Sequence, residues 1–126
     1  MQKTIFVVDD VSTNLVAAEQ TLEDYYNVLT IQSGKKAIAI LEKIVPHLIL
    51  LDIYMPEMDG FEVMHYLQNH RKFKNIPVVF LTGTEDAQLE AKCYEMGANG
   101  FIRKPFSETE LLSCVRLHVD NISNDN

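Results

Sequence analysis

The stretch IFVVDD, residues 5–10, is the strongest indication of the fold in this chain of 126 residues. Its four apolar residues are β-branched or aromatic and follow one another without polar alternation, which is typical of a strand covered on both faces. Two adjacent carboxylates, Asp9 and Asp10, come directly after this run. Like charges at the end of a buried strand are either simply solvated or placed to bind something positively charged.

Short apolar runs of the same kind recur along the chain and predict further strands. The expected strands lie at residues 4–8, 27–31, 47–51, 78–81 and 100–102. The second run is weaker and partly alternating, so we place it at an edge of the sheet. Apolar residues spaced three and four apart fill the intervening segments and indicate helices. This alternation predicts an α/β domain with a parallel sheet and helices on both faces.

Capping residues and one glycine mark the ends of the expected helices. Candidate N-terminal caps of the first, fourth and fifth helices are Ser12 or Thr13, Thr84, and Ser107 with Glu110. Ser107 and Glu110 form an S-x-x-E capping box, in which the side chain of each residue accepts the backbone N–H of the other. Gly97 is expected to end the fourth helix, because glycine readily adopts the left-handed conformation that stops a helix.

The length and composition indicate one domain with a substantial core. The chain is 47% hydrophobic, and we assign residues 1–120 to the domain and 121–126 to a polar tail or the start of a linker. Lys plus Arg is 11 and Asp plus Glu is 18, which gives a net charge of −7. This acidity argues against nucleic-acid binding by this segment, because phosphate backbones require a basic face.

The sequence also bears on location and redox state. No apolar run approaches the roughly 18–20 residues that a membrane span needs, and residues 1–4 lead into a strand rather than a signal peptide. We therefore expect a cytoplasmic protein that does not bind membranes. Cys93 and Cys114 are the only cysteines and form no C-x-x-C motif, so we expect two free thiols.

Residues suited to chemistry follow four of the five expected strands. In an open parallel sheet, ligands bind beyond the carboxyl ends of the strands. The groups expected there are Asp9 and Asp10, Asp52, Thr82, and Lys104. One such residue at a strand end is usually solvated or caps the next helix. The joint placement of three carboxylates, a hydroxyl and an ammonium at one edge favours a functional site.

Charge repulsion within this group predicts a cation. Two carboxylates about 4 Å apart repel by roughly 4 kcal/mol at an effective dielectric constant of about 20, and a third adds more. Such a cluster must take up protons, bind a cation or lower the stability of the fold. Oxygen ligands without a nearby Cys or His select Mg²⁺ or Mn²⁺ over zinc. Lys104 and the Thr82 hydroxyl would then complement phosphoryl oxygens.

The whole pattern resembles the receiver domain of two-component response regulators, in the chemotaxis-regulator-like superfamily. The residues that carry the resemblance are Asp9-Asp10, Asp52 with MPEMDG behind it, Thr82, and Lys104-Pro105-Phe106, in the expected order and spacing. The resemblance covers nearly the whole chain. It implies a doubly wound, flavodoxin-like fold with five parallel strands in the order 2-1-3-4-5.

The resemblance also implies a phosphoryl acceptor and a metal site. Asp52 would accept a phosphoryl group from a partner sensor histidine kinase, a phosphotransfer protein or a small phosphodonor. Asp10 and Asp52 would ligate Mg²⁺, or Mn²⁺ in its place, and Asp9 would do so directly or through water. The main-chain carbonyl of Tyr54 would supply another oxygen. The protein would be no enzyme beyond its self-catalysed phosphorylation and dephosphorylation.

The resemblance further implies a switch. Lys104 would pair with Asp52 before phosphorylation and with the phosphoryl group afterwards. The Lys104-Pro105 peptide bond would be cis. Thr82 would move toward the phosphoryl oxygens, and Phe101 would turn inward. The face built from the fourth helix, fifth strand and fifth helix would then change its binding, including possible homodimer formation. Phe101 lacks the hydroxyl of the tyrosine that many family members use, and plain core packing is the competing interpretation.

Three other classes of protein share parts of this pattern. A phosphohydrolase of the haloacid-dehalogenase type also forms an aspartyl phosphate, but it needs a second acid two residues later, where this chain has Tyr54. A flavodoxin-like FMN binder needs a Ser/Thr/Gly-rich loop after the first strand, where Asp9 and Asp10 would repel the flavin phosphate. A degenerate receiver that acts only as an interaction module is disfavoured by the complete set of acidic residues.

Overall fold

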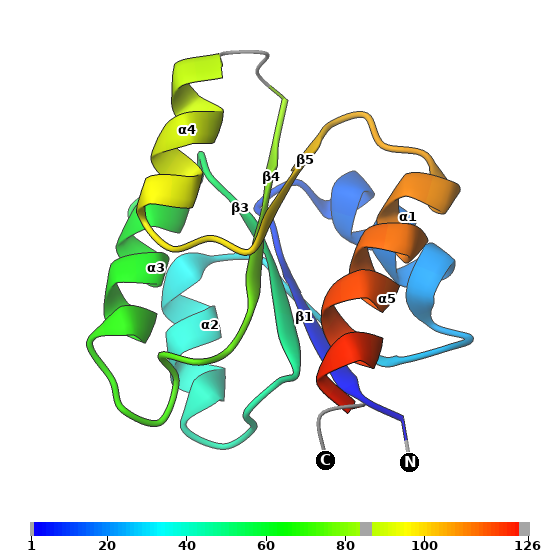
Figure 1. Ribbon diagram of the computed structural model, residues 1–126, viewed down its shortest axis with the longest axis horizontal. Helices are drawn as coiled ribbons and strands as arrows, with labels where there is room; N and C mark the ends of the chain where they lie inside the picture. The colour runs from blue at the N-terminus through cyan, green and yellow to red at the C-terminus, as the bar shows by residue number, and fades with distance from the viewer. Residues whose placement is uncertain (1, 84–86, 124–126) are drawn as a thin grey trace.

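Five parallel strands form the centre of the molecule. The structure is a computed structural model that describes residues 2–83 and 87–123. The strands run in the spatial order β2-β1-β3-β4-β5 (Figure 1). They are β1 (Thr4–Val8), β2 (Asn27–Ile31), β3 (Leu48–Asp52), β4 (Val78–Thr82) and β5 (Gly100–Arg103). The predicted fold class and strand order are confirmed, and the weak second strand lies at an edge.

The helices cover both faces of this sheet. They are α1 (Ser12–Leu22), α2 (Gly34–Leu41), α3 (Gly60–Gln68), α4 (Ala87–Glu95) and α5 (Glu108–Ser123). Helices α1 and α5 lie on one face, and α2, α3 and α4 lie on the other (Figure 1). Helix α5 continues three residues into the segment that we expected to be a tail. Among the described helices, none has the length and apolar character needed to span a membrane.

Two hydrophobic cores explain why the strands lack polar alternation. Phe6 and Val8 of β1 belong to the core beneath α2, α3 and α4, whereas Ile5 and Val7 belong to the core beneath α1 and α5. Neighbouring residues of a strand point to opposite faces, so a strand covered on both sides must be apolar throughout. Strands β3 and β4 are buried at every residue.

The start of α1 differs from the prediction. Val11 is the N-cap and makes no side-chain capping bond, and Ser12 is already the first helical residue. The prediction of Ser12 or Thr13 as the cap is therefore wrong. The physical reason is that the Asp9 carboxylate, at the end of β1, accepts the Val11 N–H at 3.0 Å and turns the chain into the helix earlier. The predicted cap Thr84 lies outside the described residues.

The predicted ends of α5 and α4 are confirmed. Ser107 Oγ accepts the Glu110 N–H at 3.0 Å, and Glu110 Oε1 accepts the Ser107 N–H at 3.2 Å, which completes the capping box. Gly97 follows α4 with φ of 99°, a conformation that favours glycine. A second capping box, Asp59 with Glu62 at the start of α3, was not anticipated. Cys93 and Cys114 are free thiols, as expected.

Candidate functional site

Strand pairing brings Asp9 and Asp52 side by side. Strands β1 and β3 are neighbours, and their register pairs Val8 with Leu51. The next residue on each strand is a carboxylate, so both acids reach the same edge of the sheet. Asp10 follows in the loop, and one oxygen from each of the three carboxylates lies within 4.8 Å of the others. Asp9 is fully buried and Asp52 is 5% exposed, whereas Asp10 is exposed.

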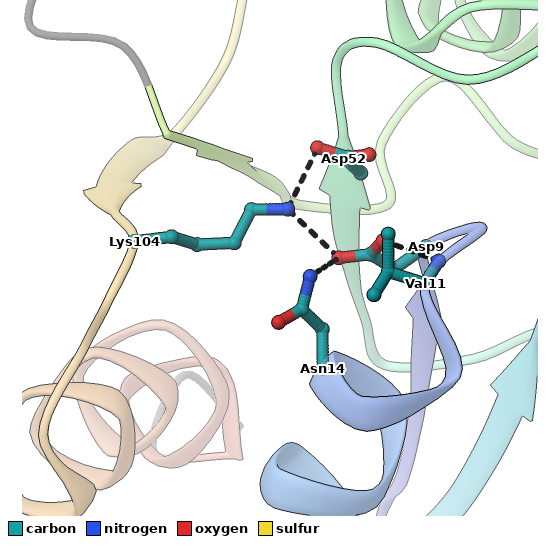
Figure 2. A network of polar contacts seen from close by, with 5 residues as sticks. All are labelled: Asp9, Val11, Asn14, Asp52 and Lys104. Atoms are coloured by element: carbon teal, nitrogen blue, oxygen red, sulfur yellow. Dashed lines mark hydrogen bonds and ion pairs between the residues drawn. The ribbon is translucent and has the colours of Figure 1, made fainter.

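Lys104 lies between the two buried carboxylates. It follows β5, and its Nζ lies 2.9 Å from Asp9 Oδ2 and 3.1 Å from Asp52 Oδ1 (Figure 2). The lysine side chain is only 16% exposed. Its peptide bond to Pro105 is cis, the isomer that the family resemblance implies. The resemblance leads us to expect a pairing with Asp52, and the structure adds a slightly shorter pairing with Asp9.

The Asp9 carboxylate is held by three donors. Its Oδ1 accepts the backbone N–H of Val11, and its Oδ2 accepts both the Lys104 ammonium and the side-chain amide of Asn14 at 3.1 Å (Figure 2). We had not singled out Asn14 from the sequence. The sequence feature that could have identified Asn14 is its position, since it places an amide side chain in the first turn of the helix that follows Asp9 and Asp10. Asp9 is thus fixed before any ligand arrives.

Burial and neighbouring charge raise the pKa of the Asp52 carboxylate. The pKa rises from 3.8 to about 6, chiefly because of burial and also because of the negative charges of Asp9 and Asp10, while Lys104 opposes the shift. Burial lowers the pKa of Lys104, but hydrogen bonds to Asp9 and Asp52 raise it by more, so its net pKa is raised. The lysine therefore stays charged, and Asp52 is mainly ionised at neutral pH.

The carboxylates fit a hard divalent cation. Mg²⁺ and Mn²⁺ prefer oxygen ligands, and Mg²⁺ usually combines one or two carboxylates with water and substrate oxygens. Asp9, Asp10 and Asp52 form a group of this kind among the described residues. Because Asp9 already accepts three hydrogen bonds, Asp10 and Asp52 are better placed to turn toward an ion.

Thr82 and Phe101 lie on the two strands beyond Asp52. Strand register pairs Asp52 with Leu81, so Thr82 ends β4 one residue further along the same edge. Thr82 is 1% exposed. Phe101 pairs with Phe80 across β4 and β5, is half-buried, and packs against the core beneath α4. The structure therefore places Thr82 at the site and Phe101 behind it, next to α4.

The loop after Asp52 requires a glycine. A Cβ on Gly60 would lie 2.4 Å from the main-chain oxygen of Asp52 and 2.9 Å from the Cα of Ile53. The Gly60 N–H donates to the Ile53 carbonyl at 2.7 Å, which closes the loop tightly against the end of β3. Tyr54, two residues after Asp52 in this loop, is 63% exposed.

Comparison with known proteins defines the class. The chain matches the response regulator receiver domain family over residues 5–116, and it belongs to that family. The resemblance stated from the sequence is thereby confirmed.

Two curated relatives and one solved receiver domain are similar to this chain over most of its length. The chain is 40% identical over 120 residues to a probable cyclic di-GMP phosphodiesterase of Vibrio cholerae, covering 95% of this chain and 27% of that protein. It is 32% identical over 120 residues to Protein PilG of Pseudomonas aeruginosa, covering 94% of this chain and 89% of PilG. A receiver domain of a signal transduction histidine kinase from Syntrophus aciditrophicus aligns with a TM-score of 0.88 at 30% identity, covering 98% and 95% of the two chains. The chain thus spans about a quarter of the first relative.

Proposed function

We propose that this receiver domain is a phosphorylation-dependent switch whose phosphoryl acceptor is Asp52. The donor is a partner histidine kinase, a phosphotransfer protein or a small phosphodonor in the cytoplasm. The observation that carries the proposal is the setting of the Asp52 carboxylate. It is buried at the end of a central strand, within 4.8 Å of two further carboxylates, and 3.1 Å from the Lys104 ammonium.

The chemistry asked of Asp52 is nucleophilic attack on phosphorus. A carboxylate oxygen of Asp52 forms the new P–O bond while the bond from phosphorus to the donor breaks, and the donor keeps the electron pair. A pKa of about 6 leaves most Asp52 ionised at pH 7 and more nucleophilic than an ordinary carboxylate. Asp9, Asp10, Asp52 and the Tyr54 carbonyl would hold Mg²⁺ or Mn²⁺. When bound, such a cation would offset charge on the carboxylate and the phosphoryl oxygens.

The residues around Asp52 supply the switch. Once Asp52 carries a phosphoryl group, the Lys104 ammonium can bind its oxygens in place of the free carboxylate. The Thr82 hydroxyl donates to another oxygen, and Phe101 turns into the space that Thr82 leaves. The face formed by α4, β5 and α5 then changes its affinity for partners, including a second copy of the domain. The change is a shift between two existing populations.

Acetyl phosphate labelling tests the acceptor. With Mg²⁺ present, intact mass should show one added phosphoryl group on the natural protein and none on Asp52→Asn. Asp24→Asn, an exposed aspartate elsewhere on the fold, is the matched control and should label normally. Full labelling of Asp52→Asn would sink the assignment. Sustained release of phosphate from added phosphoesters with Mg²⁺, over many turnovers, would instead indicate a phosphohydrolase.

A further inference from the structure

The end of the sheet opposite the acidic site carries a surface of the reverse charge. We call residues 43–47 and 70–77 the basic pole. These segments precede β3 and β4, so they lie at the amino ends of the same strands whose carboxyl ends hold Asp52 and Thr82 (Figure 1). With five residues per strand, the two ends are roughly 16 Å apart. The basic pole is thus separate from the acidic site.

The charge of the basic pole is positive on a chain that is strongly negative. Lys43, Arg71, Lys72 and Lys74 are all exposed, and no described carboxylate forms an ion pair with any of them. Residues 43–51 and 63–84 contain no Asp or Glu at all. If the adjoining Glu42 is included, this surface has four positive side chains and one negative one. Its net charge is then +3, whereas the net charge of the whole chain is −7. Charge segregation of this kind attracts an acidic partner.

An apolar pocket lies within this positive surface. Its volume is about 240 Å³, and its lining residues are Pro46, His47, Lys72, Asn75, Ile76 and Pro77. Ile44 and Val45 beside it are each 40% exposed. The Thr4 N–H donates to His47 Nδ1 at 3.1 Å, which leaves Nε2 as the donor of the neutral ring. The lining of the pocket therefore combines apolar residues with side chains that carry N–H donors.

The size of the pocket limits what it can hold. Pockets for drug-sized ligands usually start at about 300 Å³, so this one suits a single large side chain better than a small-molecule ligand. Interfaces commonly gain their affinity by seating one apolar anchor in such a pocket within a polar rim. A second groove, of about 260 Å³ between α1 and α5, is lined in part by Asp24 and Glu108 and would repel an acidic partner.

We propose that the basic pole docks an acidic segment of a partner protein, which inserts one apolar side chain between Pro46 and Ile76. Carboxylates on either side of that side chain pair with Lys72 and its neighbouring cations. Docking at this pole is independent of phosphorylation at Asp52, because no residue of the acidic site takes part. The receiver can therefore be held by one partner at this pole while the opposite edge exchanges phosphoryl groups.

An NMR titration with a defined probe tests this proposal. The probe is a capped peptide with one central Leu and two Glu on each side, added to the ¹⁵N-labelled protein. One apolar anchor with a few exposed charge pairs predicts a Kd on the order of 1 mM, which amide shifts can measure. The shifted amides should belong to residues 43–47 and 70–77. Replacing the central Leu by Ser should weaken binding about tenfold.

Two protein variants of equal charge change separate docking at the pole from general attraction. Lys72→Glu should raise the Kd about tenfold, because it exchanges an attraction for a repulsion. Lys36→Glu alters an exposed lysine of α2 at the opposite end of the sheet and should change the Kd by less than about twofold. Asp52→Asn should bind the peptide normally, so failure of the proposed phosphorylation leaves this test intact.

Several results would overturn the proposal. These are the absence of saturable shifts up to about 10 mM peptide, shifts that map to the groove between α1 and α5, or equal weakening by Lys72→Glu and Lys36→Glu. Binding of anionic lipid vesicles or duplex DNA through Lys72, without binding of the peptide, would also overturn it and assign the pole to a membrane or a nucleic acid.

Discussion

Lys104 is the residue that makes two buried carboxylates tolerable at the edge of the sheet. Its ammonium contacts both Asp9 and Asp52, and all three side chains are largely withdrawn from water. Removing one partner of a buried charge group leaves the others uncompensated, which costs far more than the group contributed as a whole. The stability of the site without a metal ion therefore depends on this lysine.

We predict that Lys104→Met lowers the free energy of unfolding by about 2 kcal/mol in urea at pH 7 without divalent ions. Added Mg²⁺ should recover most of the loss, because a cation replaces the missing positive charge. Lys35→Met is the control, since the Lys35–Glu57 pair has side chains 65% and 71% exposed and should matter by less than about 0.5 kcal/mol. Equal losses in the two variants would contradict the role given to Lys104.

Asp52 gives the stability of the protein a pH dependence of known sign. Its pKa in the folded state, about 6, lies above the ordinary value of 3.8. The folded state therefore holds this proton more tightly, so the contribution of Asp52 to stability is full below about pH 4 and is lost as pH rises through about 6. Above that pH the ionised carboxylate destabilises the fold.

Asp52→Asn should consequently be more stable than the natural protein at pH 7. We expect a gain of about 2 kcal/mol, from a pKa raised by about two units at 1.36 kcal/mol each with some relaxation of the site. The gain should shrink to about 0.5 kcal/mol at pH 4, where Asp52 is protonated in the folded state but only about half protonated in the unfolded chain. Urea unfolding of both proteins from pH 4 to 8 without Mg²⁺ measures it. A gain that is the same at every pH would rule out Asp52 as its source.

At the scale of single elements, the end of α4 depends on one glycine. The Gly97 and Ala98 amides donate to the carbonyls of Tyr94 and Cys93, which closes the helix end. Gly97 has φ of 99°, and a Cβ there would lie 2.6 Å from Nε2 of Gln68. The Gln68 amide is the end of an exposed, flexible side chain and can move aside, so the backbone conformation is what disfavours any other residue here.

Gly97→Ala should lower the free energy of unfolding by about 1–2 kcal/mol, because alanine is strained at this φ. Gly83→Ala is the matched control: a Cβ at Gly83 meets no described atom within 4 Å, and its φ is not in the positive range. Thermal unfolding of the two variants measures the difference. A loss at Gly83 as large as that at Gly97 would show that the conformation of Gly97 is not what matters.

The elements also show where sequence reasoning succeeds and where it fails. The capping box of Ser107 and Glu110 is predictable because all of its groups lie within four residues of one another. The start of α1 is not, because the N-cap is Val11, whose N–H donates to Asp9 at the end of β1, whereas the hydroxyl residues that follow suggest a local cap. Local capping rules miss this start because a carboxylate outside the helix fixes the turn into it.

At the scale of the whole molecule, the alternation of apolar runs and helical spacing predicts the class of fold, and the family resemblance predicts the strand order. The gathering of Asp9, Asp52 and Lys104 follows from that order. The contacts of Lys104 with both carboxylates could not be predicted, because they depend on side-chain positions that the sequence pattern does not specify. The same holds for the hydrogen bond from Asn14 to Asp9. The sequence likewise contains the acid-free segments of the basic pole, but only the fold shows that they meet around one pocket.

We propose that this edge of the sheet directs a phosphoryl group to one aspartate. The most direct measurement is to treat the protein with acetyl phosphate and Mg²⁺, reduce the acyl phosphate with borohydride, and locate the resulting homoserine by tandem mass spectrometry. We expect homoserine in place of Asp52 alone, and none when Mg²⁺ is removed by a chelator. Homoserine in place of Asp9 or Asp10, or none at all with Mg²⁺ present, would contradict it.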